Sequence, residues 1–111
     1  MVNIMITSQK TFTNMTNYYI AIDVRGGISG STLPEEEAYI TLPAGQQGTV
    51  SYGGDFMYYL RVHFENNGNV NFTQTLIDIS RTGTLYHFFN ENESFKIGFD
   101  DDSFMLKLTR Y

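Results

Sequence analysis

The 111-residue sequence contains no cysteine, no tryptophan and only two prolines. Without cysteine the chain can form neither a disulfide-stapled scaffold nor a thiolate metal site, and it has no cysteine nucleophile. No stretch approaches the roughly 20 apolar residues of a membrane-spanning helix. The first residues, MVNIMITSQK, lack the basic start and the apolar run of a signal peptide. We therefore expect a cytoplasmic protein, or one secreted by a route that needs no signal peptide.

Positive charge is also scarce. Seven Lys and Arg stand against 12 Asp and Glu, so the chain is acidic, with a formal net charge of -5 at pH 7. The basic residues are scattered singly, which argues against binding to nucleic-acid phosphates. The same charge disfavours an anionic membrane surface. Neutral ligands such as glycans carry no such penalty.

What the chain does have is aromatic residues, 15% of the total, in a pattern that alternates between apolar and polar. Period-two runs rich in Tyr, Phe, Ile, Val and Thr, separated by Gly, Asn and Asp, are typical of short strands. No window of about a dozen residues shows the spacing of an amphipathic helix. The sequence predicts one all-β domain over residues 1–111. We expect an antiparallel, jelly-roll-like β-sandwich of about eight or nine strands, with a barrel as the alternative.

The expected strands follow the alternation along the chain. In the second of them, Ile20 and Ile22 fall on one face and Tyr19 and Asp23 on the other. The last two form a hairpin whose expected register sets Lys96 opposite Lys107. The predicted strands cover residues 2–7, 17–25, 37–42, 49–52, 56–65, 69–80, 84–89, 94–99 and 103–110.

The stretch FMYYLRVHFENNGNVNF, residues 56–72, reads as a β-hairpin with two competing registers. A two-residue loop at 67–68 would oppose apolar residues to polar ones and leave both faces mixed. A three-residue loop at 66–68 instead pairs Phe64 with Val70. A slip of one residue moves every side chain to the other face, so burial should favour the three-residue loop.

This register defines a candidate binding surface. It turns a polar set with one aromatic ring and one cation away from the core, and alternation in the neighbouring strand adds Tyr19. The predicted ligand-binding residues are Tyr19, Tyr59, Arg61, His63, Asn71 and Thr73.

Signals for catalysis are weak. The two histidines, His63 and His87, have no adjacent carboxylate pattern of the kind that accompanies a zinc site. No G-x-S-x-G elbow surrounds any serine, and no catalytic triad can be assembled from spacing. We therefore expect a protein that is not an enzyme.

Calcium is the one cofactor for which the sequence offers ligands. Asp100, Asp102 and Asp55 carry hard oxygen donors on predicted turns, and Ca²⁺ takes six to eight oxygen ligands. Two loops would have to meet, because consecutive residues cannot all converge on one ion. The competing interpretation is that acidic turns only favour solvation and hairpin closure.

The aromatic doublets point to recognition. Tyr18-Tyr19 and Tyr58-Tyr59 lie in strands, so each doublet sends one ring inward and one outward. An outward tyrosine offers an apolar face to sugar C–H groups and a hydroxyl for hydrogen bonds. The leading hypothesis is a lectin-like, carbohydrate-binding protein that forms a homo-oligomer and gains avidity. Two alternatives stay open: a membrane-lipid-binding or pore-forming toxin component, and a structural or assembly protein.

Overall fold

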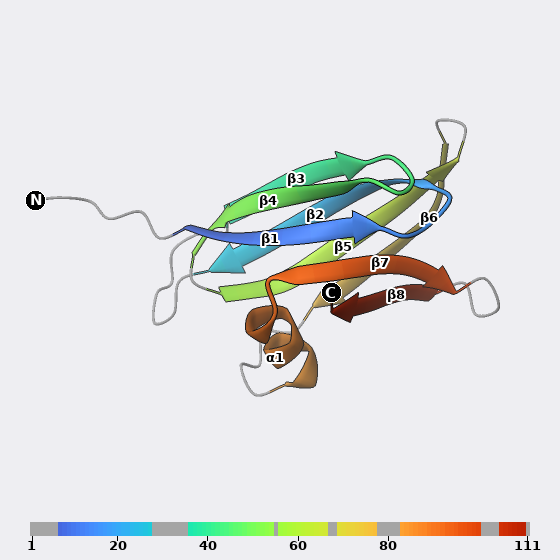
Figure 1. Ribbon diagram of the computed structural model, residues 1–111. Coiled ribbons are helices and arrows are strands. Elements are labelled where there is room, and N and C mark those ends of the chain that lie inside the picture. Colours follow the sequence, from blue (N-terminus) through green and yellow to red (C-terminus); the bar gives the residue numbers. More distant parts are fainter. Residues whose placement is uncertain are drawn as a thin grey trace, which may run out of the picture.

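The computed structural model describes residues 7–27, 36–54, 56–66, 69–77, 83–100 and 105–110. Within these residues eight strands form two four-stranded sheets packed face to face (Figure 1). The predicted all-β sandwich is confirmed. The described strands form two open sheets and not the closed barrel that was the alternative.

Sheet A has the strand order β4-β1-β7-β8. β1 pairs in parallel with β7 and antiparallel with β4, and β7 pairs antiparallel with β8. Among the described strands of both sheets, the pairing of β1 with β7 is the one that is parallel. The strand bounds are β1 Thr7–Asn14, β4 Gln47–Gly53, β7 Ser94–Asp100 and β8 Met105–Arg110.

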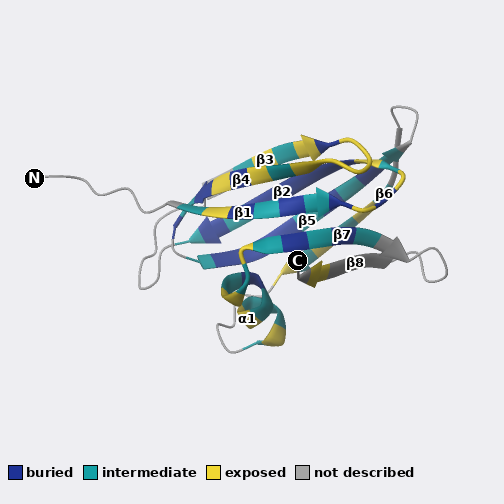
Figure 2. Cartoon of the chain, viewed as in Figure 1, coloured by how far each residue is buried: buried dark blue, intermediate teal, exposed yellow. Residues whose placement is uncertain are grey.

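Sheet B has the order β3-β2-β5-β6 and is antiparallel throughout. Its strands are β2 Tyr19–Gly27, β3 Glu36–Leu42, β5 Phe56–Asn66 and β6 Asn69–Ile77. The core lies between the two sheets, where Figure 2 shows buried residues running along the central strands. Its buried members are Phe12, Ile20, Ile22, Val24, Leu42, Val50, Tyr52, Met57, Leu60, Val62, Phe64, Phe89, Phe95 and Ile97.

The first described strand runs beyond its predicted position. The expected strand at 2–7 falls largely on residues that the structure does not describe, and β1 covers Thr7–Asn14. Its inward positions include the core residue Phe12 but also Lys10 and Asn14, both buried. These two polar residues interrupt the apolar alternation on which the prediction relied.

The β5–β6 hairpin combines elements of both expected registers. Asn66 pairs with Asn69, so the connection has two residues and the predicted three-residue loop is wrong. A β-bulge then shifts the register between Phe64 and Glu65, and Phe64 faces Phe72, with ring centroids 5.8 Å apart. This pairing differs by two residues from the predicted one. A shift of two leaves each side chain on the face expected for it.

The β7–β8 hairpin shows a similar shift of two residues. Lys96 lies opposite Thr109, and Lys107 opposite Gly98. The expected pairing of Lys96 with Lys107 is therefore wrong. The observed register avoids placing two like charges directly across a strand pair, which is destabilising.

The predicted strand at 84–89 is wrong, because Thr84–Glu91 form the helix α1. Leu85, Phe88 and Phe89 have the i, i+3, i+4 spacing of one helical face, and Phe89 is fully buried. The helix has no side-chain bond at its N-cap, no acidic residue in its first turn and no basic residue in its last. Contacts with the core therefore account for more of its stability than its own termini do.

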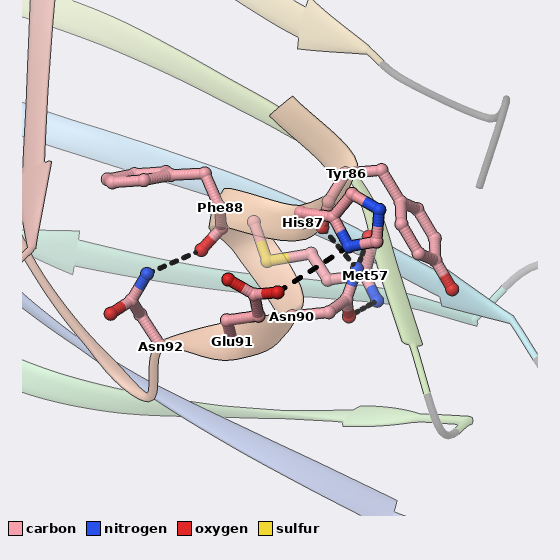
Figure 3. Close-up of polar contacts among 7 residues, drawn as sticks. All are labelled: Met57, Tyr86, His87, Phe88, Asn90, Glu91 and Asn92. Atoms are coloured by element: carbon pink, nitrogen blue, oxygen red, sulfur yellow. Dashed lines mark hydrogen bonds and ion pairs between the residues drawn. The ribbon is translucent and has the colours of Figure 1, made fainter. Parts of the chain in front are cut away.

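One asparagine of α1 fastens the helix to the start of β5 (Figure 3). The backbone N–H of Met57 donates to Asn90 Oδ1 over 2.8 Å, and Asn90 Nδ2 donates to the Met57 carbonyl over 2.9 Å. A neighbouring strand would make these same two hydrogen bonds to the Met57 backbone. The described part of β6 ends at Ile77, opposite Tyr59, and does not extend to Met57. The Asn90 amide therefore satisfies the backbone groups of Met57 in place of a strand.

Asn14 joins the two sheets at one end of the sandwich. Its side chain is fully buried, and Nδ2 donates to the carbonyls of Tyr18, over 2.8 Å, and Leu42, over 3.0 Å. Its Oδ1 accepts from the backbone N–H of Thr16, over 2.9 Å, and from the Thr16 hydroxyl, over 2.6 Å. This amide uses both donors and both acceptor positions.

Candidate functional site

The outward side of sheet B carries a set of side chains that we call the outer facet. These residues alternate with core residues in each strand, so they point away from sheet A. The described members of the outer facet are Tyr19, Ala21, Asp23, Arg25, Tyr39, Thr41, Tyr59, Arg61, His63, Glu65, Thr73, Thr75 and Ile77.

One cross-strand row crosses the middle of the outer facet. Tyr39 of β3 lies opposite Asp23 of β2, which in turn lies opposite Arg61 of β5. Arg61 lies opposite Thr75 of β6. Directly opposite residues on one face of a sheet have Cβ atoms about 5 Å apart, so these four side chains are neighbours.

An ion pair lies at the centre of this row. Arg61 Nη2 donates to Asp23 Oδ2 over 2.7 Å. The Asp23 side chain is 1% exposed, whereas that of Arg61 is 35% exposed. Among the described residues, neither Asp23 Oδ1 nor Arg61 Nε has a hydrogen-bond partner. The pair therefore presents a partly exposed guanidinium that a buried carboxylate holds in place.

Beside the ion pair, Arg25 covers the ring of Tyr59. The guanidinium carbon of Arg25 lies 4.3 Å from the Tyr59 ring centroid, a cation–π contact. Tyr59 is on the outward side as predicted but only 8% exposed, so its ring is not displayed to solvent as expected. Its position beneath Arg25 makes it a support of the outer facet.

The predicted residues His63 and Thr73 lie together. His63 Nδ1 is 2.6 Å from Thr73 Oγ1, across the β5–β6 pair. Ala21 lies on the other side of His63 in the register. The structure thus brings both predicted residues into the row next to the ion pair.

The aromatic rings that the outer facet does display are those of Tyr39 and Tyr19, with exposed fractions of 61% and 41%. Tyr19 was predicted as a site residue and lies opposite Glu65. Tyr39 projects from the edge strand β3 beside Asp23. An exposed tyrosine beside fixed polar groups offers both stacking and hydrogen bonding.

The structure does not describe the side chains of the remaining predicted site residues. Asn71 falls at the β5–β6 bulge and has no opposite residue in the register, and its side chain lies outside the described set. Of the calcium candidates, Asp55 and Asp102 lie outside the described residues, and Asp100 is described only as the end of β7. The calcium hypothesis therefore stays a prediction. Within the described part of the chain, no three His, Asp or Glu side chains cluster to hold a metal ion.

Asp23 is one of the site residues, with Arg25 and Tyr39, that are absent from the predicted ligand-binding set. Alternation in the second strand predicted the face on which Asp23 lies. It did not predict that Asp23 would lie opposite Arg61. An acidic residue and a basic residue on the outward faces of two strands are a signal for a cross-strand ion pair. Applying it requires the strand order, which alternation does not supply.

A second buried charge, Lys10, lies in the middle of β1. The Lys10 ammonium donates to the Asn92 carbonyl over 2.5 Å and lies 5.9 Å from the Phe95 ring centroid. Burial lowers the pKa of Lys10 from its ordinary value of 10.5, and the nearby charge of Glu93 partly opposes this. The ammonium thus ties β1 to the segment that follows α1.

We expect this buried charge to appear in the pH dependence of stability. Because the folded state releases the Lys10 proton at a lower pH than the unfolded chain, unfolding takes up a proton in the alkaline range below 10.5. The contribution of Lys10 to the unfolding free energy therefore rises with pH in that range. Urea titrations of wild type and Lys10→Met should show the difference moving in favour of wild type as pH increases. A difference that stays constant or moves the other way would contradict the assignment.

Comparison of the chain with protein-family models, with curated proteins and with solved structures finds no match. Within the described part of the chain, no helix has the length and apolar character needed to cross a membrane.

Proposed function

We propose that this protein is a lectin-like, non-enzymatic carbohydrate-binding protein that binds its ligand on the outer facet. The observation that carries the proposal is the exposed ring of Tyr39 in the same cross-strand row as the Asp23–Arg61 ion pair. A sugar lying on that ring would have a partly exposed guanidinium within about two strand spacings. Apolar stacking and oriented hydrogen bonds are the two contacts that sugar recognition uses.

Charge balance supports a neutral glycan as the ligand. The described side chains of the outer facet include two cations, Arg25 and Arg61, and two anions, Asp23 and Glu65. The Asp23 carboxylate already compensates the Arg61 guanidinium. A balanced surface favours neither anionic nor cationic ligands, whereas hydroxyl groups can use both donors and acceptors.

The proposal includes self-association. A single shallow site on a sheet offers limited contact area, and linking two sites in one assembly raises overall affinity without new contacts. We propose a homo-oligomer that presents several outer facets to one glycan-bearing surface.

Tyr39→Ala is the variant that tests the site. Because Tyr39 is 61% exposed, its removal should change the unfolding free energy by less than about 0.5 kcal/mol. Loss of the stacking ring should weaken glycan binding about tenfold, or by about 1.4 kcal/mol. Isothermal titration with a glycan identified on an array measures this. Met15→Ala, which removes a 60%-exposed side chain outside the outer facet, is the matched control and should bind normally.

Equal affinities for Tyr39→Ala and wild type would show that the outer facet is not the glycan-binding site. Repeating the titration in EDTA separates the calcium hypothesis from the site itself. Affinity lost in EDTA and restored by added Ca²⁺ would assign an ion to the complex.

A further inference from the structure

The edges of the two sheets differ in how they are protected. β3 and β6 are the edge strands of sheet B, and β4 and β8 those of sheet A. An edge strand offers backbone N–H and C=O groups to any other strand, and natural proteins guard edges with charges, prolines or a covering element. The outer strand that lacks these guards is where another chain can add.

Each of the other three edges either lies beside a second edge strand or carries charged residues. β3 and β4 lie side by side along one flank of the sandwich (Figure 1). The side chains of β3 lie over β4, because a Cβ added at Gly48 would come within 2.5 Å of Ile40 Cδ1 and 2.9 Å of Leu42 Cδ2. β8 contains two basic residues, Lys107 and Arg110. Basic residues on an edge strand oppose its pairing with a second copy.

Among the described residues, β6 has none of these guards. Its nine residues, Asn69–Ile77, include no charged residue and no proline. Among the described strands it pairs only with β5. Thr73 and Thr75 are exposed, and the inward-facing Phe72 and Leu76 are only partly buried against the core. A further strand at this edge would extend the sheet and complete the burial of Phe72 and Leu76.

We propose that β6 is a homodimer interface, in which β6 pairs antiparallel with β6 of a second copy about a two-fold axis at Gln74. The segment Phe72–Leu76, FTQTL, has the same apolar–polar pattern in both directions. The two-fold places Phe72 opposite Leu76 on the core side and Thr73 opposite Thr75 on the outer side. Both are favourable cross-strand pairs, and no like charges meet.

A second copy is the occupant that this strand fits best, because a two-fold contact must be complementary to itself. The dimer would contain one continuous eight-stranded sheet. It would carry two outer facets on the same side and so supply the multivalency that glycan binding at a surface requires. The pairing itself does not depend on the proposed ligand, so it can fail or hold independently of carbohydrate binding.

Size-exclusion chromatography with light scattering tests the interface. Wild type should have twice the 12.7 kDa mass of one chain. Gln74→Lys puts two ammonium groups directly opposite each other across the axis, and we expect it to raise the dimer dissociation constant at least tenfold. Gln47→Lys makes the same substitution on the edge strand β4 and should remain dimeric. Circular dichroism checks that each variant is folded.

A cysteine variant fixes the register independently of any effect on folding. Because the chain has no cysteine, Gln74→Cys introduces a single thiol. Opposite residues of an antiparallel pair have Cα atoms about 4.5 to 5.5 Å apart, which is within disulfide range. Mild oxidation should give a covalent dimer with Gln74→Cys and not with Gln47→Cys. A monomeric wild type, a dimer unaffected by Gln74→Lys, or equal cross-linking of both cysteine variants would overturn the proposal.

Discussion

Replacing Asn14 by aspartate is expected to lower the unfolding free energy by about 4 kcal/mol at pH 7. The Asn14 amide donates to the carbonyls of Tyr18 and Leu42 and is fully buried. A carboxylate has no N–H to give, so both carbonyls would be left facing an acceptor, and a charge would be buried with them. Urea denaturation followed by circular dichroism measures the loss.

The pH dependence of the Asn14→Asp variant separates its two effects. At pH 4 the introduced carboxyl group, once protonated, regains one O–H donor and loses its charge, so the deficit relative to wild type should shrink. Asn14→Ala removes the hydrogen bonds without adding a charge, and its deficit should be the same at both pH values. A loss below about 1 kcal/mol for Asn14→Asp at pH 7 would show that the amide does not hold this end of the sandwich.

The second large effect is expected for Arg61→Ala, at about 3 kcal/mol of unfolding free energy. This substitution leaves Asp23, 1% exposed, as a buried carboxylate without its counterion. The partial exposure of Arg61 places the value at the lower end of the range for broken buried ion pairs. Thermal and urea unfolding of the variant measure it.

A double-mutant cycle isolates the contribution of the pair. If the cost of Arg61→Ala comes from the orphaned carboxylate, Asp23→Ala together with Arg61→Ala should be more stable than Arg61→Ala alone. Thr41→Ala, on the outer facet but outside the ion pair, should add its own small effect independently. Strictly additive losses for the two charged residues would argue that the 2.7 Å contact contributes nothing.

The sandwich and the faces of its strands could be predicted because alternation reports burial directly. Ile20, Ile22 and Phe64 are core residues as expected, and Arg61 and His63 point outward. The pairing register of the strands was harder to predict from the sequence. In both hairpins the observed pairing differs from the predicted one by two residues, which moves no side chain to the other face. Burial of one face therefore cannot distinguish these registers, and a bulge or a turn decides between them.

The two errors in secondary structure have local causes. β1 carries Lys10 and Asn14 at inward positions, where each donates to backbone carbonyls of other segments. α1 is a short helix in which Tyr86, Phe88 and Phe89 have β-type propensity. Phe89 and Asn90 hold this helix through tertiary contacts. Such contacts override local preference, and no window of the sequence contains them.

The candidate site was predicted in part. Alternation placed Tyr59, Arg61 and Thr73 on one outward face, where the structure also has them. It could not indicate that Arg25 covers Tyr59, nor that Tyr39 from another strand is the more exposed ring. Both facts depend on which strands are neighbours, and β2 and β5, which pair at the centre of sheet B, are distant in the sequence.

The central claim, that the outer facet binds carbohydrate, is tested most directly by a glycan array probed with wild type and Tyr39→Ala side by side. We expect wild type to bind a group of neutral glycans with little dependence on salt concentration, and Tyr39→Ala to lose most of that signal while remaining folded. Absence of binding by wild type to every glycan on the array, or an unchanged signal for Tyr39→Ala, would contradict it.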